Sequence, residues 1–322
     1  MTEKGITNLN YGLLILLAGT IGANIYLASV DVTPKQETIV VEKKFGQFLQ
    51  ENWQVQAKAT TENLATEEIT GEELLTNAQA FLVMDTESKK ILASKNEKME
   101  LYPASTTKIV TALTAREIYQ PDELLTAAAS DLNNGNSLSL TEGEQIQIDT
   151  LFKALLIESD NQAAEILASH DPQGRIAFLA RMNQKATDLG LAQSNFVNPQ
   201  GFDEAGQKMT AFDLAVASLE LLRDDYLAGI VQQVQLQTKE ATGKVRTLNN
   251  TNQLLQMKNL NYQVLGVKTG TTDLAGEVLV SLLKREEQEV IVVVLGAKNR
   301  YNETIKIADY VWNNYVWTMN AE

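Results

Sequence analysis

The sequence predicts an α+β fold in which an antiparallel sheet is flanked by helices and adjoins a mostly helical lobe. Two apolar hairpins indicate the sheet, one over residues 80–93 and the other over residues 278–295. Between them lies mostly helical sequence, including apolar positions at helical spacing from 176 to 189 that end at Gly190. Since the hairpins stand at opposite ends of this region, we expect distant parts of the chain to complete one sheet.

Within the first hairpin, Ala80 to Met84 is a compact apolar run that a polar turn separates from Ile91 to Ala93. The second hairpin joins two nearly continuous apolar runs, which is typical of strands buried on both faces. In the helical part, Thr210 with Asp213 three residues later predicts a capped helix that runs through Leu222. A final helix around residues 305–315 is expected to pack on the sheet.

The composition excludes several chemistries. Of the 322 residues, 41 are acidic and 27 are basic, giving a net charge of −14. The absence of cysteine removes disulfides, thiol nucleophiles and cysteine zinc sites. The single histidine, His170, cannot form a histidine-rich zinc site, although a carboxylate site for a hard cation stays open. The acidic balance, without a basic stripe, argues against a nucleic-acid partner.

Residues 11–30 carry no charge and are rich in Leu, Ile, Ala and Gly. At ~1.5 Å per residue, a helix of this length spans a hydrocarbon core ~30 Å thick. We interpret the segment as a transmembrane anchor; the alternatives are a cleaved signal peptide, with the cleavage point at Ala23, and a buried core helix. Lys4 before it and Asp31 after it weakly place residues 1–10 in the cytoplasm and the rest outside.

Four segments follow from this pattern. Residues 1–10 form a cytoplasmic tail, and residues 11–30 form the anchor or signal. Residues 31–75 are rich in Gln, Glu, Lys and Thr and are expected to be a spacer. Residues 76–319 form the folded domain that carries the motifs described next.

The first motif is Ser105-x-x-Lys108, which opens an apolar helix after Pro103. A serine hydroxyl is a weak nucleophile until a neighbouring group takes its proton. A lysine at i+3 lies on the same helix face and can take that proton if desolvation lowers its pKa. The alternative is an ordinary capping serine with a surface lysine.

Two further motifs are weak when each stands alone. The turn Ser159-Asp160-Asn161 separates two helical runs and can project polar side chains into a cleft, although a simple capping turn is the more usual explanation of such a segment. The segment Lys268-Thr269-Gly270-Thr271 precedes the last hairpin. On a strand edge, its lysine and hydroxyl can bind a carboxylate, and its glycine lets a substrate backbone lie close.

Together, in the order S-x-x-K, S-D-N and K-T-G, the motifs resemble those of the serine D-alanyl-D-alanine carboxypeptidases, the low-molecular-mass penicillin-binding proteins related to class A β-lactamases. The resemblance covers roughly residues 76–318 and includes the connecting segments 133–144, 196–203 and 294–297. It implies a β-lactamase/transpeptidase-like fold, with the transmembrane helix preceding it.

The resemblance implies a catalytic group of three residues. Ser105 would be the acylated nucleophile, Lys108 its proton acceptor, and Ser159 the relay of a proton to the leaving amine. The backbone N–H groups of Ser105 and Thr271 would form the oxyanion hole. Acyl transfer to a serine needs no Lewis acid, so we expect neither a metal nor a cofactor.

The resemblance also implies a substrate-binding group. Asn161 would hold the substrate amide, Lys268 would neutralise the terminal carboxylate, and Thr269 would hydrogen-bond that carboxylate. Gly270 would leave room for the acyl chain, and Thr271 would bind the substrate carbonyl oxygen through its backbone N–H.

The function implied is removal of the terminal D-alanine from peptidoglycan stem peptides, through a serine acyl-enzyme, at the bacterial cytoplasmic membrane. The partners expected are the stem peptide, β-lactam antibiotics as covalent inhibitors, and the membrane itself through residues 11–30. The catalytic domain would be extracytoplasmic, or secreted if the signal is cleaved.

Three other functions stay open. A class A-like β-lactamase would need a deacylating carboxylate, and Asp203 and Glu204 lie in the right interval between motifs. A DD-endopeptidase would use the same site, and a non-catalytic penicillin sensor would have a degenerate one. Glu158 departs from the family pattern, which more often has a small residue before the S-D-N serine.

Overall fold

The structure, a computed structural model, describes residues 53–57, 69–70, 74–132, 138–239, 243 and 245–319. The predicted tail, the predicted anchor at 11–30 and most of the predicted spacer lie outside these residues. No helix in the described part of the chain has the length and apolar character needed to cross a membrane.

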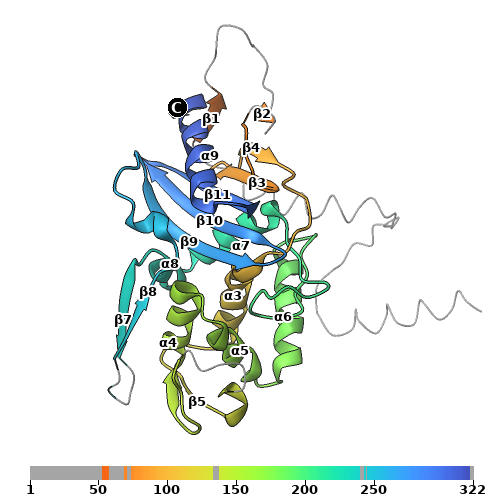
Figure 1. Cartoon of the computed structure of the whole chain (residues 1–322), viewed down its shortest axis with the longest axis vertical. Helices are drawn as coiled ribbons and strands as arrows, with labels where there is room; N and C mark the ends of the chain where they lie inside the picture. The colour runs from red at the N-terminus through yellow and green to blue at the C-terminus, as the bar shows by residue number, and fades with distance from the viewer. Residues whose placement is uncertain are drawn as a thin grey trace, which may run out of the picture. The chain divides into compact units, whose positions relative to one another are not determined.

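Six strands form the central sheet, in the order β2-β4-β3-β11-β10-β9 (Figure 1). All neighbouring strands pair antiparallel except β2 and β4, which are parallel. Both predicted hairpins are therefore confirmed, together with their union in one sheet. The strands are β2 Ile69–Thr70, β3 Ala80–Asp85, β4 Ile91–Lys95, β9 Gln263–Thr272, β10 Gly276–Arg285 and β11 Gln288–Ala297.

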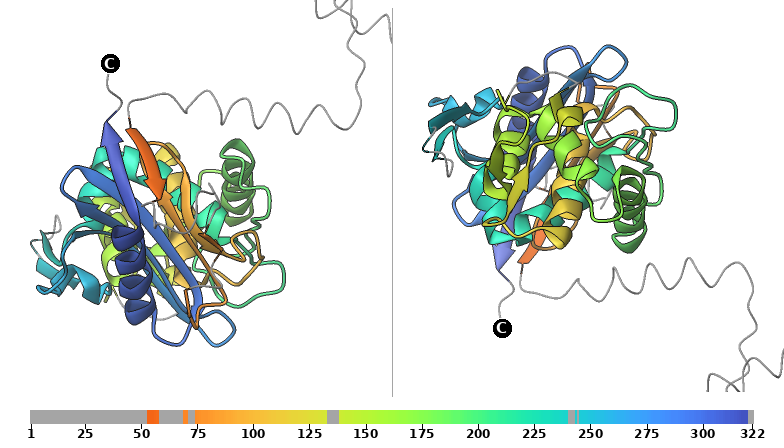
Figure 2. Two further views of the ribbon diagram at one scale, coloured as in Figure 1. Left: turned by 90° about the horizontal axis from the view of Figure 1, so that it is seen from above. Right: turned by 90° about the horizontal axis from the view of Figure 1, so that it is seen from below.

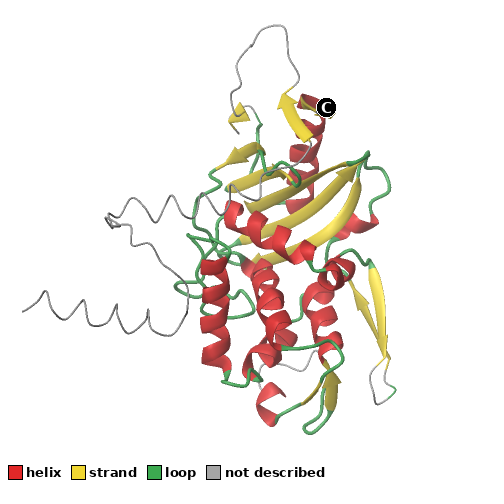
Figure 3. Ribbon diagram, turned by 180° about the vertical axis from the view of Figure 1, so that it is seen from behind, coloured by secondary structure: helices red, strands yellow, loops and turns green. Residues whose placement is uncertain are grey.

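The sheet is buried on both faces, which explains the continuous apolar runs. Successive residues of a strand point to opposite faces. Val292 accordingly joins the core beneath α9 (Arg300–Asn314), whereas Val293 joins the core shared with α7 (Ala211–Arg223) and the lobe. Figures 1 and 3 show α9 on one side of the sheet and the remaining helices on the other.

The helical lobe packs around α3, whose first turn begins in the short 3₁₀ turn η1. Figure 3 shows its helices gathered below the sheet. Its elements are η1 Ala104–Thr107, α3 Lys108–Ile118, η2 Ala129–Leu132, α4 Ile148–Lys153, the π turn η3 Ala154–Glu158, α5 Asn161–Ser169, α6 Arg175–Asp188 and α8 Asp225–Val231.

The predicted helix boundaries hold where local chemistry sets them. The Thr210 hydroxyl accepts the Asp213 backbone N–H at 3.0 Å and starts α7 as expected. The helix predicted up to Gly190 is α6, in which Met182 and Ala186 are buried. Ile176, from the same apolar periodicity, is 85% exposed, so its predicted place on the core face is wrong.

Three pairs of short strands lie outside the main sheet. Two join segments close in sequence, whereas the third joins strands near opposite ends of the chain, β1 beside β12 (Figure 2). Strands β1 and β2 lie in the segment predicted as a spacer, where no strand was expected. Their partners are distant in the sequence, so the local pattern of residues does not indicate the pairing. The pairs are β1 Trp53–Ala57 with β12 Tyr315–Met319, β5 Leu124–Thr126 with β6 Gln145–Gln147, and β7 Gln235–Lys239 with β8 Val245–Asn249, and the turn η4 Gln253–Gln256 follows β8.

Candidate active site

The structure brings Ser105 and Lys108 together at the junction of η1 and α3. The Lys108 ammonium donates to the Ser105 hydroxyl at 2.8 Å. It also donates to Oδ1 of Asn161 at 2.7 Å and to the backbone carbonyl of Gln200 at 2.8 Å. Three separate segments of the chain therefore meet at this one nitrogen.

The electrostatics of Lys108 suit a proton acceptor. Its side chain is fully buried, and burial lowers its pKa to about 7, with the charge of Asp160 partly opposing that shift. A lysine with this pKa is unprotonated in a substantial fraction of molecules at neutral pH, whereas an ordinary lysine is almost wholly charged.

The S-D-N turn reaches this centre through Asn161. Ser159 adopts the left-handed conformation, with φ 60° and ψ 34°, where η3 ends. Asp160 then caps α5 by accepting the Ala163 backbone N–H at 2.7 Å, and Asn161 as the first helical residue contacts Lys108. Among the described residues, no hydrogen bond joins the Ser159 hydroxyl to Ser105 or Lys108.

Glu158, which departs from the family pattern, contacts the β7–β8 strand pair. Its Oε1 accepts the backbone N–H of Asn249, the last residue of β8, at 3.2 Å. This contact gives the larger side chain a structural role.

The K-T-G segment lies on β9, the edge strand of the sheet. A Cβ added at Gly270 would lie 2.9 Å from both the Cβ of Ala104 and the backbone nitrogen of Ser105. The missing side chain therefore makes room for the turn that carries Ser105 itself. This is a structural use of Gly270 in addition to the room for an acyl chain that the resemblance implies.

Lys268 is buried behind this edge. Its ammonium donates to the backbone carbonyl of Thr269 at 3.0 Å. Burial lowers its pKa well below the usual value, and repulsion from Lys108 and Arg300 adds to the effect. An approaching carboxylate would reverse part of this shift, because a nearby opposite charge favours the charged form.

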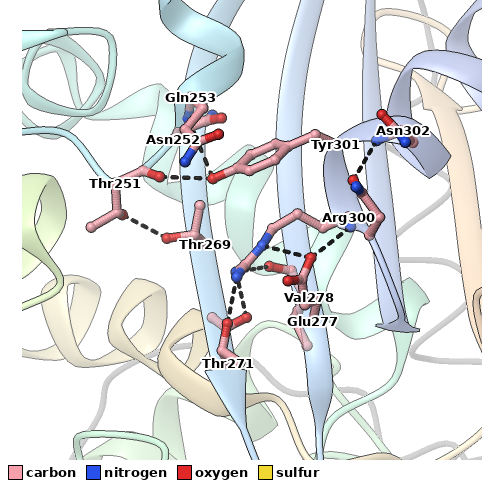
Figure 4. Close-up of polar contacts among 12 residues, drawn as sticks. Thr251, Asn252, Gln253, Thr269, Thr271, Glu277, Val278, Arg300, Tyr301 and Asn302 are labelled. Atoms are coloured by element: carbon pink, nitrogen blue, oxygen red, sulfur yellow. Dashed lines mark hydrogen bonds and ion pairs between the residues drawn. The ribbon is translucent and has the colours of Figure 1, made fainter.

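A second cation, Arg300, lies at the same edge (Figure 4). No motif in the sequence predicted it as a site residue. At the start of α9, its guanidinium donates to the Gly270 carbonyl at 2.6 Å and to the Thr271 hydroxyl. Glu277 holds it in place through an ion pair of 3.3 Å and by accepting its backbone N–H at 2.8 Å. The only signal in the sequence is a basic residue shortly after an apolar strand, which is not specific.

Thr251 and Tyr301 form a chain of hydrogen bonds that ends at Thr269 (Figure 4). The hydroxyls of Thr251 and Thr269 lie 2.6 Å apart. The Tyr301 phenol donates to the Thr251 backbone carbonyl at 2.8 Å, which ties this loop to α9. No motif in the sequence indicates these two residues.

The acidic pair between the second and third motifs is engaged in loop structure. One oxygen of Asp203 accepts from the Thr272 hydroxyl at 2.6 Å, and the other accepts from the Leu274 backbone N–H at 2.9 Å. Glu204 accepts from Asn198 at 3.1 Å. Within the described residues, no group of three or more His, Cys, Asp or Glu side chains is arranged to hold a metal ion.

Comparisons with known proteins agree with this arrangement of motifs. The chain is 31% identical over 253 residues to the D-alanyl-D-alanine carboxypeptidase DacF of Bacillus subtilis, covering 76% of this chain and 64% of that protein. It is 34% identical over 248 residues to DacC of Escherichia coli, covering 72% of this chain and 60% of that protein. The chain therefore spans about three fifths of the length of these curated relatives.

The fold also matches a solved structure, that of penicillin-binding protein D2 from Listeria monocytogenes in its cefotaxime-bound form. The TM-score is 0.64 at 26% identity, covering 74% of this chain and 98% of that one. The penicillin-binding-protein type of α+β fold is thereby confirmed. A family model described as D-alanyl-D-alanine carboxypeptidase matches residues 66–299. The chain belongs to this family of D-alanyl-D-alanine carboxypeptidases, peptidase S11.

Proposed function

We propose that the protein is a serine DD-carboxypeptidase that removes the terminal D-alanine from peptidoglycan stem peptides. One observation carries the proposal: a buried lysine, its pKa lowered to about 7, lies 2.8 Å from the hydroxyl of Ser105. The activity of the family and the names of the relatives support the same reaction.

In the proposed acylation, neutral Lys108 accepts the hydroxyl proton of Ser105 as its oxygen bonds to the carbonyl carbon of the penultimate residue. The peptide bond to the last D-alanine then breaks, and Ser159 relays to the leaving amine the proton that Lys108 took from Ser105. Backbone N–H groups of Ser105 and Thr271 stabilise the negative charge on the carbonyl oxygen. Water then hydrolyses the ester and frees Ser105.

The terminal carboxylate of the substrate would bind at the cationic edge of β9. Lys268 supplies charge, the Thr269 hydroxyl supplies a hydrogen bond, and Arg300 adds a second cation beside Gly270 and Thr271. Asn161, already within 2.7 Å of Lys108, would turn its amide toward the substrate amide.

β-Lactams would acylate the same serine, since their strained amide and carboxylate imitate the end of the peptide. The cefotaxime-bound structural relative supports this. We expect the resulting ester to persist, because both carboxylate oxygens of Asp203 are already bonded within the loop and Oε2 of Glu204 accepts from Asn198. This observation also argues against the class A-like β-lactamase alternative.

We further propose that residues 11–30 anchor the protein in the bacterial cytoplasmic membrane as a single pass, with residues 31–75 as the spacer and the catalytic domain outside. The support is the run of 20 residues without a charge.

The decisive experiment is incubation of the protein with a stem pentapeptide, measuring released D-alanine, with Ser105→Ala as the matched control. Release by the wild type alone supports the carboxypeptidase. Cleavage of cross-linked dimers without D-alanine release would identify an endopeptidase. Fast, repeated turnover of penicillin would identify a β-lactamase, and a protein with no turnover at all would be a sensor.

A further inference from the structure

The nitrogen of Lys108 needs one particular orientation to serve as a base. A neutral amine has two N–H groups and one lone pair, and only the lone pair can take the proton of Ser105. Two acceptor oxygens, Oδ1 of Asn161 at 2.7 Å and the backbone oxygen of Gln200 at 2.8 Å, lie at this nitrogen. When each accepts one N–H, the lone pair is left facing the Ser105 hydroxyl at 2.8 Å.

These two acceptors come from different segments of the chain. Asn161 is the first residue of α5, whereas Gln200 belongs to the segment 198–204. Glu165 joins the two, because it lies one turn after Asn161 in α5 and its Oε2 accepts from Nε2 of Gln200 at 2.6 Å. The side chain of Gln200 therefore reaches α5 while its backbone carbonyl reaches Lys108 in α3.

The contact between Glu165 and Gln200 is buried and held on both sides. Gln200 is 5% exposed, and its Oε1 has no hydrogen-bond partner among the described residues, so in this part of the chain the Glu165 contact alone fixes the amide. Oε1 of Glu165 accepts from Nε of Arg175 at 2.6 Å and from the Ser169 hydroxyl at 3.1 Å. Because a hydrogen bond to a carboxylate is stronger than one between neutral groups, the contact sets the distance between Gln200 and α5 firmly.

The backbone on either side of Gln200 is tied to α3 and to its own turn. The Thr111 hydroxyl donates to the Pro199 carbonyl at 2.7 Å, and Oδ1 of Asn198 accepts the Gly201 backbone N–H at 2.7 Å. These contacts set the path of the segment along α3, but they do not reach α5. The position of Gln200 relative to α5 therefore depends on Glu165.

Resting on the proposed function, we propose that Glu165 is a positioning residue for the acylation of Ser105. It acts through Gln200, whose carbonyl it keeps at the amine of Lys108. Among the described residues, Glu165 hydrogen-bonds neither Ser105 nor Lys108, so it takes no part in the proton transfer itself. Without Glu165, the carbonyl moves away, the amine rotates, and an N–H replaces the lone pair before the serine hydroxyl in many of the molecules.

The test measures the limiting rate at which a fluorescent penicillin acylates Ser105 at about pH 8.5, above the pKa of about 7 of Lys108, so that the amine is neutral. Glu165→Ala removes the acceptor and should lower this rate about five- to tenfold, the range of one hydrogen bond, while the affinity of the preceding noncovalent complex stays unchanged.

Glu165→Gln should stay within about twofold of the wild-type rate. It keeps an oxygen for Nε2 of Gln200, because Arg175, whose side chain is 40% exposed, can turn to water. A purely electrostatic role of the carboxylate would be lost equally in Glu165→Gln and Glu165→Ala, so the two variants separate position from charge.

Gln200→Met removes the same link from its other end and keeps both the length of the side chain and the backbone carbonyl. It should lower the limiting rate by the same factor as Glu165→Ala. The double variant should lose no more than either single variant, because residues that act as one unit are not additive. Losses that multiply in the double variant would show two separate roles and overturn the proposal.

Glu220→Ala is the matched control. It removes a glutamate of α7 that is paired with Arg223 at 2.9 Å, and it should acylate at the wild-type rate. Denaturant unfolding checks the fold of every variant, and Gln200→Met carries the test if Glu165→Ala does not fold. A wild-type limiting rate in Glu165→Ala, or an equal loss in Glu165→Gln, would overturn the positioning role alone. A wild-type protein that penicillin acylates but that releases no D-alanine from a stem pentapeptide would instead overturn the proposed function.

Discussion

Lys108 and Asn161 lie 2.7 Å apart, Nζ to Oδ1, although one opens α3 and the other opens α5. The contact places the starts of two helices at one point, where Ser105 and the carbonyl of Gln200 also meet the lysine. Since the starts of helices carry partial positive charge, both favour the negative charge that develops during acyl transfer.

Replacing Lys108 by alanine should slow acylation by ~10²–10⁴-fold, the usual contribution of a positioned acid–base group. The measurement is the rate of covalent labelling by a fluorescent penicillin. Lys208→Ala, at a half-exposed lysine paired with Glu100 on the surface, is the control and should label at the wild-type rate. Rapid labelling of Lys108→Ala would assign the proton transfer to another group.

The rate of acylation should rise with pH and level off above about 7, because the neutral form of Lys108 is the base and burial lowers its pKa to about 7. Asp160→Asn should move the rising limb to lower pH, since the charge of Asp160 holds that pKa up. Asparagine retains the capping oxygen for α5. A rate profile that Asp160→Asn leaves unmoved, with the fold intact, contradicts this electrostatic coupling.

Gly270→Ala should slow acylation sharply, because its new Cβ would lie 2.9 Å from Ala104 and from the nitrogen of Ser105. Gly229→Ala is the matched control: its added Cβ meets nothing within 4 Å, and it lies within α8. That variant should keep full activity and gain ~0.5–1 kcal/mol in free energy of unfolding. Penicillin labelling and denaturant unfolding check the pair.

Thr251→Val should raise KM for the peptide about three- to tenfold with a smaller change in kcat, because it removes the hydroxyl 2.6 Å from that of Thr269. Tyr301→Phe should act in the same direction by freeing the loop that carries Thr251. Thr247→Val, at an exposed position of β8, is expected to change neither constant. Steady-state kinetics with a stem pentapeptide would detect the difference.

The full-length protein should fractionate with membranes, and deletion of residues 1–30 should release an active soluble domain. The reason is the uncharged segment 11–30. The measurement is immunodetection and penicillin labelling of both fractions. A processed chain beginning near Asn24 in the soluble fraction would establish the cleaved signal instead.

The sequence by itself determined the elements whose causes are local. The hairpins follow from apolar runs around polar turns, the start of α7 follows from Thr210 and Asp213, and the three motifs identify the family through their order. These features depend on neighbours a few residues apart, which a linear pattern records. The apolar periodicity predicted that Ile176 lies on the buried face of its helix, and this was wrong. Spacing along a helix does not show how much of the helix surface the elements packed against it cover.

Only the tertiary structure decided which distant residues complete the site. Arg300, Thr251 and the Gln200 carbonyl reach the motif residues through packing of α9, the loop after β8 and the segment 198–204. The use of Gly270 was also decided there, because the clash it avoids is with another segment. The pKa of Lys108 depends on complete burial, and burial is a property of the whole fold. The pairing of β1 with β12 shows the same limit, since backbone hydrogen bonds between strands leave no mark in side-chain order.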